Sequence, residues 1–166
     1  VTSGVVPGFV MYQLMLDNST AVETSYMQWF PYLGFIIALG SCFRLANFNI
    51  DTRQTDSFIG LPTPANALFI LSLPVVLINT DSLVVIEILT SQWILLRITL
   101  YNAYILNAEI PLFSLKIKNF SFKKYKLQIG FLMLSLFYIF LFDYLAIPMV
   151  IVSYVLLSVI NNKFKI

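Results

Sequence analysis

The chain has 166 residues, of which 59% are hydrophobic and 11% charged, and its net charge is +2. A soluble domain is about 45–50% apolar and about 25% charged, so the composition argues against a soluble all-α core and favours a polytopic α-helical membrane protein. The chain has no histidine and one cysteine, Cys42. This excludes a histidine-based acid/base or metal site, a disulfide framework and a thiolate metal site. The basic residues lie beside hydrophobic runs, so they do not indicate nucleic-acid binding.

Hydrophobic segments follow one another along the whole chain and predict a single all-α domain, residues 1–166, built as a bundle of about six transmembrane helices. The segments cover residues 1–16, 27–48, 61–79, 84–108, 127–142 and 145–160. Most of them approach the ~20 residues that cross a bilayer. No initiator methionine or basic leader precedes the first segment. We therefore expect this segment to be truncated and the chain to be the C-terminal part of a longer protein.

Loops that carry lysine or arginine alternate along the chain with loops that carry neither. This alternation predicts the orientation of the segments. The loops at 49–60 and 109–126 carry these residues, as does the C-terminal tail, whereas the loops at 17–26, 80–83 and 143–144 carry none. The basic loops and the first residue are therefore predicted to be cytoplasmic, and the other loops external. The five lysines of 109–126 serve this topology; binding of anionic lipid headgroups is the alternative.

Residues 43–66 form a polar, arginine-bearing stretch with glycine and prolines between two hydrophobic runs. Polar groups at membrane depth are expensive and indicate function. Arg44 lies near the cytoplasmic end of its segment, and Asn47 and Asn49 follow at i+3 and i+5. On a helix Arg44 and Asn47 share a face, which predicts that a guanidinium and an amide point into one pocket. A guanidinium fork matches phosphate or carboxylate oxygens; an arginine that extends to the interface is the structural alternative.

The run Gly60-Leu61-Pro62-Thr63-Pro64-Ala65 predicts a tight entry into the third segment. A proline in the first helical turn loses no hydrogen bond, because that N–H has no intrahelical partner. Glycine permits close approach of the backbone, and the free N–H groups of a helix N-terminus favour an anion. By itself the run is a common start of a membrane helix.

Two charged residues, Glu87 and Arg97, lie within the fourth hydrophobic segment. Ten residues of helix span about 15 Å, so these side chains cannot pair with each other on one helix. Charge inside a membrane segment suggests function, but we expect a structural role for both residues.

The runs R-L-A-N-F-N at 44–49 and G-L-P-T-P-A-N at 60–66 together resemble the R-L-A-R-F-N … G-L-P-x-P-x-A segment of bacterial phosphatidylserine synthases. These enzymes belong to the CDP-alcohol phosphatidyltransferase family. The runs S-G-V-V-P-G at 3–8 and A-E-I-P-L-F-S-L-K-I-K at 108–118 are similar to further segments of the same enzymes. At Asn47 the chain departs from the family, which commonly has arginine or lysine there.

The resemblance implies a phospholipid-synthesis enzyme of the bacterial inner membrane. It would transfer the phosphatidyl group of CDP-diacylglycerol to L-serine at the cytoplasmic face, giving phosphatidylserine and CMP, among membrane lipids and commonly as a homodimer. The substrate-binding residues that it implies are Arg44, Asn47, Asn49, Gly60, Pro62, Pro64, Ser3 and Gly4.

The family's catalytic fingerprint, D-x2-D-G-x2-A-R … G-x3-D-x3-D, does not occur in this sequence. In the family its aspartates bind Mg²⁺ or Mn²⁺, so the resemblance implies no catalytic or metal-binding residue in this chain. One alternative within the class is a transferase for another alcohol, such as inositol phosphate or glycerol phosphate. Outside the class, a small transporter is the alternative, but the segments show no inverted repeat and the polar residues lie at the cytoplasmic ends.

Overall fold

The computed structural model describes residues 2–18, 25–50, 58–112 and 126–164. The described residues confirm the all-α prediction. The helices are α1 (Thr2–Asp17), α2 (Ile36–Ile50), α3 (Thr63–Asn79), α4 (Leu83–Thr90), α5 (Gln92–Asn107), α6 (Lys126–Phe142) and α7 (Ala146–Phe164), with 3₁₀ segments η2 (Ser25–Phe35) and η3 (Asp143–Leu145). Two short strands, β1 (Phe58–Ile59) and β2 (Pro111–Leu112), pair antiparallel.

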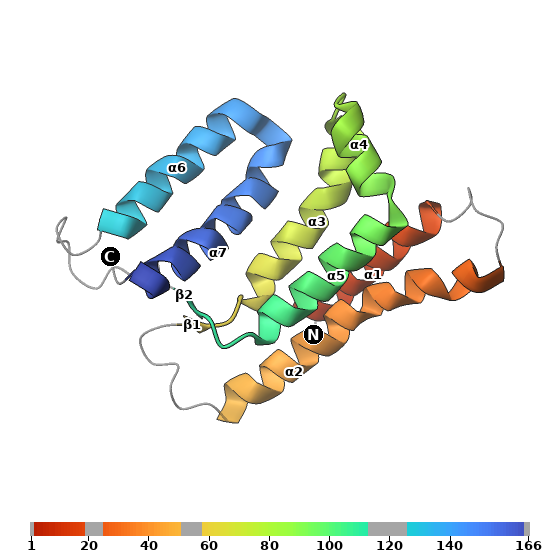
Figure 1. The fold of residues 1–166 in the computed structure, drawn as a ribbon, viewed down its shortest axis with the longest axis horizontal. Coiled ribbons are helices and arrows are strands. Elements are labelled where there is room, and N and C mark those ends of the chain that lie inside the picture. The colour runs from red at the N-terminus through yellow and green to blue at the C-terminus, as the bar shows by residue number, and fades with distance from the viewer. Residues whose placement is uncertain (1, 19–24, 51–57, 113–125, 165–166) are drawn as a thin grey trace.

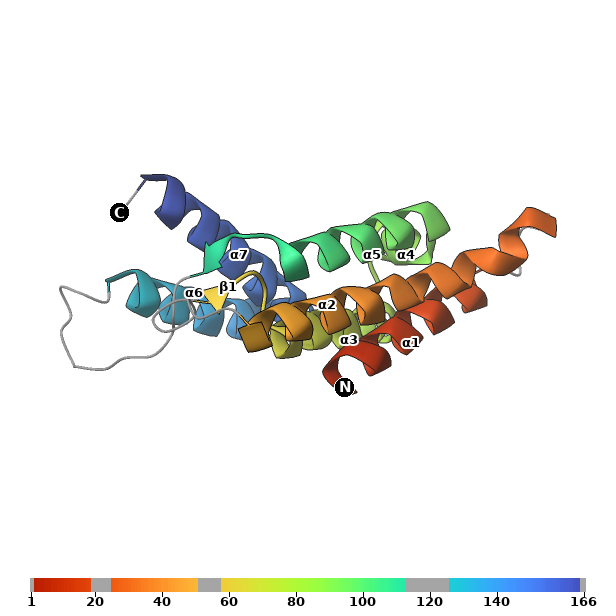
Figure 2. The same ribbon diagram turned by 90° about the horizontal axis from the view of Figure 1, so that it is seen from below.

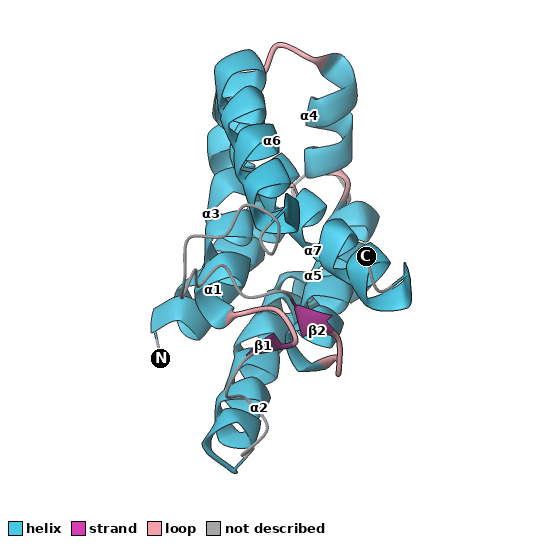
Figure 3. Cartoon of the chain, turned by 90° about the vertical axis from the view of Figure 1, so that its left-hand side faces the viewer, coloured by secondary structure: helices cyan, strands magenta, loops and turns pink. Residues whose placement is uncertain are grey.

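The ends of the helices gather at two opposite ends of the molecule (Figure 1). One end holds the start of α1, the ends of α2, α5 and α7, the starts of α3 and α6, and the two strands; Figure 3 views the molecule from this side. The other end holds the end of α1, the start of η2, the connection of α3 to α4 and the α6–α7 turn. The elements joined by lysine- and arginine-bearing loops thus meet at one end, and those joined by loops without these residues meet at the other.

Two helical stretches in the described part of the chain are long and apolar enough to cross a membrane, Gln28–Asn49 and Leu127–Asn162. The second has 36 residues, far more than the ~20 that one crossing needs. The 3₁₀ segment η3, where Asp143 takes a positive φ of 42°, folds this stretch into the α6–α7 hairpin (Figure 1).

The fourth hydrophobic segment is not the continuous helix that we predicted over 84–108. It is divided into α4 and α5, which meet at an angle of 71°. Ser91 at the junction has an extended backbone, with φ −75° and ψ 115°, so it cannot continue a helix. The bend separates the exposed Glu87 from the exposed Arg97. If the bent pair counts as one span, the described residues contain three candidate spans.

Small residues bring α1 close to η2 and α2. A Cβ atom at Gly4 would lie 2.7 Å from the Cβ of Ser41, and one at Gly34 would lie 2.6 Å from the backbone nitrogen of Tyr12. Gly8, one turn after Gly4, faces Ala38. Helices inside a bilayer associate through such small residues, because their surroundings are as apolar as their side chains. The glycines therefore set the position of α1 against α2.

We expect Gly34→Ala to destabilise the protein by about 1–3 kcal/mol, because the new methyl group meets backbone atoms that cannot move aside. Gly130→Ala is the matched control, because a Cβ at Gly130 meets nothing within 4 Å. The control should gain about 0.5–1 kcal/mol, the usual benefit of alanine over glycine within a helix. Thermal unfolding of the purified variants in detergent measures both changes. Equal stability of the two variants would contradict the close approach of α1 and η2.

The buried apolar side chains form two clusters. The first joins helices α1 to α5, with Met11, Met15, Ile37, Ile70 and Leu95 fully buried in it. The second joins the α6–α7 hairpin to Leu61 and to residues at and after the end of α5. In Figures 1 and 2 the hairpin lies to one side of the other helices. Most large apolar side chains of α6 are exposed, as expected of a helix that faces lipid.

Candidate functional site

The side chain of Arg44 is buried where α2 passes the end of α5. It is 8% exposed, and its Nη1 donates a hydrogen bond of 2.7 Å to the carbonyl oxygen of Leu106. The carbonyl groups of a last helical turn lack intrahelical partners and carry partial negative charge, so they suit a guanidinium. Arg44 therefore lies inside the helix bundle and does not extend from it to an interface.

Gly60 lies directly against the guanidinium. A Cβ atom there would be 2.7 Å from Nη1 of Arg44 and 2.7 Å from the carbonyl oxygen of Leu106. Gly60 also has a positive φ of 72°, which side-chain-bearing residues rarely adopt. Its N–H donates to the carbonyl of Ile110 at 2.8 Å, and the N–H of Leu61 donates to that of Ile105 at 3.2 Å. The predicted close backbone approach at Gly60 is confirmed, and its partners are Arg44 and the end of α5.

Helix α3 begins as the proline-containing run predicts. Pro62 is the N-cap residue with φ −58° and ψ 135°, and Pro64 lies in the first turn. The N–H of Asn66 closes the first turn by donating to the carbonyl of Pro62 at 3.1 Å. The side chain of Pro62 is partly buried, whereas that of Pro64 is exposed. Arg44, Gly60 and the N-terminus of α3 thus lie at one corner of the bundle.

A small cavity of about 90 Å³ lies beside this corner, between α1, α2 and the start of α3. Ser3, Gly4, Ser41, Cys42 and Thr63 are among the residues that line it. The cavity brings together residues from three segments that are far apart in the sequence. It includes Ser3 and Gly4, two of the residues that the resemblance implied.

Two buried polar side chains, one on α2 and one on α3, were not singled out from the sequence, and only Ser41 lines the cavity. Ser41 is 6% exposed and Asn66 is fully buried, and the hydroxyl of Ser41 and both amide atoms of Asn66 have no hydrogen-bond partner. A signal for each was present in the sequence. Ser41 precedes Arg44 by three residues and so shares its helix face, and Asn66 ends the G-L-P-T-P-A-N run.

The expectation that Arg44 and Asn47 point into one pocket is wrong, because Arg44 is buried whereas Asn47 and Asn49 are exposed. The last turn of α2 extends beyond the end of α5 (Figure 1), so its side chains have no neighbouring helix to pack on. Asn107 on α5 instead donates from its amide nitrogen to the carbonyl of Gly40 at 2.9 Å. This bond, together with that of Arg44, ties α5 to α2.

The described residues do not fit a divalent metal ion. Among them, no three histidine, cysteine, aspartate or glutamate side chains come together, and hard cations need several oxygen ligands.

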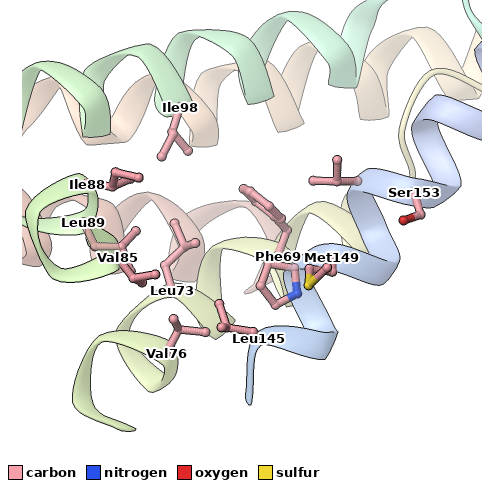
Figure 4. A pocket seen from close by; sticks show the side chains of 12 residues that line it. Phe69, Leu73, Val76, Val85, Ile88, Leu89, Ile98, Leu145, Met149 and Ser153 are labelled. Carbon is pink, nitrogen blue, oxygen red and sulfur yellow. The ribbon is translucent and has the colours of Figure 1, made fainter. Parts of the chain in front are cut away.

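A second cavity of about 550 Å³ lies at the opposite side of α3, against α4, α5 and the start of α7 (Figure 4). Figure 4 shows that its walls are aliphatic and aromatic, with Ser153 the one hydroxyl among the labelled side chains. The hydroxyl of Ser153 donates to the phenol oxygen of Tyr138 at 3.3 Å. This cavity offers hydrocarbon surface, and the hydroxyl of Ser153 in its wall is hydrogen-bonded to Tyr138.

No family model, curated protein or solved structure matches this chain. Chemically, the corner can hold a small anionic or polar group. A guanidinium and a helix N-terminus lie there, beside a small cavity lined by apolar side chains, the hydroxyls of Ser3, Ser41 and Thr63 and the thiol of Cys42.

Proposed function

We propose that this protein is a multi-pass membrane transferase that moves the phosphatidyl group of CDP-diacylglycerol to L-serine. The observation that carries the proposal is the buried Arg44 against Gly60, beside the N-terminus of α3. These are the residues of the two sequence runs that resemble phosphatidylserine synthases. The corner would bind an anionic group of the substrates, a phosphate or the serine carboxylate.

In the proposed reaction the hydroxyl oxygen of serine attacks the lipid-attached phosphorus. A new phosphorus–oxygen bond forms, the bond from that phosphorus to the bridging oxygen breaks, and CMP leaves with the bridging oxygen. The hydroxyl proton passes to a carboxylate, which the resemblance assigns to the aspartate motif absent from this sequence. Arg44 and the N–H groups at the start of α3 stabilise the negative charge at the reacting phosphates or hold the serine carboxylate. The bond from Nη1 to Leu106 fixes the orientation of the guanidinium for this purpose.

We further propose that the chain crosses the bacterial inner membrane in about six segments, with this corner at the cytoplasmic face. The separation of the helix ends into two groups supports the proposal (Figure 1). The distribution of lysine and arginine also supports the proposal. Outside the spans these residues occur only in the loops and tail at one end, and loops that carry them are retained in the cytoplasm.

The proposed topology can be tested with single cysteines in a Cys42→Ser background. Thr20→Cys and Lys118→Cys place the thiols in the two kinds of loop; both positions lie outside the described residues. A membrane-impermeant thiol reagent applied to intact cells should label the protein at position 20 but not at position 118. Lysing the cells should make position 118 reactive. Labelling of 118 and not of 20 in intact cells would reverse the orientation and move the corner to the external face.

The identity of the acceptor alcohol is tested by CMP release. The active protein is the chain preceded by helices that carry the aspartate motif. Membranes that contain it are supplied with CDP-diacylglycerol, Mg²⁺ or Mn²⁺, and one acceptor at a time. L-serine should give CMP, whereas glycerol 3-phosphate and inositol 1-phosphate should not. CMP release with glycerol 3-phosphate or inositol 1-phosphate, and not with serine, would support the same class of enzyme with a different acceptor. CMP release with none of the three would contradict the proposed function.

A further inference from the structure

We propose that the cavity of about 550 Å³ between α3, α4, α5 and the start of α7 holds one acyl chain of a phospholipid, from the membrane leaflet at the end of the molecule opposite Arg44. The inference requires that the α6–α7 hairpin lies in a bilayer, as its length and apolar composition indicate. It does not depend on phosphatidyl transfer, because the cavity shares no residue with the corner around Arg44.

The cavity opens onto the lipid-facing surface of the helices. Leu73 and Val76 in its wall are buried. Ile88 on α4 and Val152 on α7 are 40% and 46% exposed, so they form its rim. Val152 also belongs to the stretch Leu127–Asn162, which is long and apolar enough to cross a membrane. A rim on a membrane-crossing hairpin faces the hydrocarbon of the bilayer, so acyl chains are the molecules that meet this cavity.

Exposed aromatic side chains mark the membrane interface nearest to the cavity. Trp29, Trp93 and Tyr144 are exposed and lie in η2, at the start of α5 and in η3. The ring centroid of Trp93 is 5.4 Å from that of Phe30 in η2, so these elements meet at the end opposite Arg44 (Figure 1). Tryptophan and tyrosine are enriched where a bilayer meets water. This end of the molecule therefore lies at an interface.

The depth of the cavity matches the hydrocarbon of one leaflet. Leu145 in its wall directly follows Tyr144. Ser153 is the lining residue furthest along α7, and it lies about 10 Å from the start of that helix at 1.5 Å per residue. One leaflet contributes about half of the ~30 Å hydrocarbon thickness. The cavity thus extends from the interface into the acyl region of a single leaflet, which is the external one in the proposed topology.

The chemistry and volume of the cavity select one hydrocarbon chain. None of the described side chains in its wall is ionisable, and the hydroxyl of Ser153 is bonded to Tyr138. A buried water needs about 2–4 polar partners, so water does not fill this space. At ~30 Å³ for each methylene group, close to the share of one molecule in liquid water, about 550 Å³ has room for roughly 18 such groups.

The same volume excludes a helix from a second copy of the chain. One turn of an α-helix, about 10 Å wide and about 5.4 Å long, occupies roughly 400 Å³. The cavity of about 550 Å³ therefore holds little more than one turn, whereas a single acyl chain fits within it along its length.

The test compares the lipid retained by variants that fill the cavity. Val76→Phe and Val85→Phe place a ring in it from α3 and α4, because both residues line it (Figure 4). Val75→Phe is the matched control, because Val75 is 41% exposed on α3 and does not line the cavity. Protein extracted from membranes in mild detergent is examined by native mass spectrometry. The parent and the control should retain one phospholipid per chain, and each filled variant should retain about tenfold less or lower still.

Thermal unfolding separates loss of lipid from loss of folding. The purified chain is stripped of lipid, and dioleoylphosphatidylglycerol is then added. The melting temperature of the parent and of Val75→Phe should rise by about 5–10 °C, the shift expected from a ligand at ~100-fold its Kd. Without added lipid, Val76→Phe and Val85→Phe should melt above the parent, because the ring occupies volume that is otherwise empty. Added lipid should shift their melting temperatures less.

Three results would overturn the inference. The first is a parent protein that retains no phospholipid, or that retains a free fatty acid in its place. The second is equal retention by the parent and a folded filled variant, since the lipid would then lie elsewhere on the surface. The third is a parent whose melting temperature does not rise with added lipid, which needs no variant. Neither measurement uses CDP-diacylglycerol or serine, so the outcome is independent of the proposed transfer.

Discussion

Replacing Arg44 with lysine is expected to remove most of the serine-dependent CMP release of the active protein, by a factor of about 10–100. Lysine keeps the positive charge, but its single ammonium cannot reproduce the planar fork of a guanidinium. In the structure Nη1 is committed to the carbonyl of Leu106 at 2.7 Å. A lysine that keeps this bond presents no second, geometrically fixed donor to a phosphate or carboxylate.

Arg97→Lys is the matched control for this substitution, because Arg97 is exposed on α5. Lys118→Ala is a second control, in a loop that lies outside the described residues. Both should retain activity close to that of the parent. Thermal unfolding of the same preparations shows whether Arg44→Lys is folded when it is assayed. If the Arg44→Lys protein is folded and as active as the parent, Arg44 only links α2 to α5. That result would contradict the proposed anion site.

The 166-residue chain by itself should show no serine-dependent CMP release and no tight binding of Mg²⁺ or Mn²⁺. Hard divalent cations are bound by several oxygen ligands, usually including carboxylates. Asp17 and Asp143 lie at the end of the molecule opposite Arg44 (Figure 1), and Glu87 is separated from the corner by the bend at Ser91. The remaining acids are Glu23, Asp51, Asp56, Asp81 and Glu109, the first three of which lie outside the described residues.

This second prediction is measured by calorimetric titration of the purified chain with MnCl₂ and by CMP release in the presence of CDP-diacylglycerol and serine. The chain preceded by helices that carry the D-x2-D-G-x2-A-R … G-x3-D-x3-D motif should release CMP in a metal- and serine-dependent way. Serine-dependent CMP release by the 166-residue chain alone would show that its own residues carry out the catalysis.

The helices could be predicted from the sequence because long apolar runs leave few alternatives to a helix. Helix α3 begins at its proline-containing run, as predicted. The break at Ser91 was not predicted, because the hydrophobic run continues through it and the bend depends on how α4 and α5 pack. The paired strands were also missed, since two residues carry no periodicity.

The site was predicted in part. The burial of Arg44 follows from the cost of exposing a charged group within a membrane segment, and the need for glycine at position 60 follows from the backbone conformations that only glycine readily adopts. The exposure of Asn47 does not, because helical spacing shows which residues share a face but not where the neighbouring helix ends. Ser41 and Asn66 were overlooked for a related reason. Their importance appears only when α1, α2 and α3 are packed together and their polar atoms are left without partners.

The most direct test of the proposed transfer follows the phosphorus atom. CDP-diacylglycerol labelled with ³²P at the lipid-attached phosphate is incubated with the active protein, L-serine and Mg²⁺ or Mn²⁺, and the products are separated. We predict that the label appears in phosphatidylserine, that CMP forms unlabelled in equal amount, and that both products disappear when serine is omitted. Label in CDP or in free phosphate, or CMP release that does not depend on serine, would contradict the transfer of a phosphatidyl group to serine.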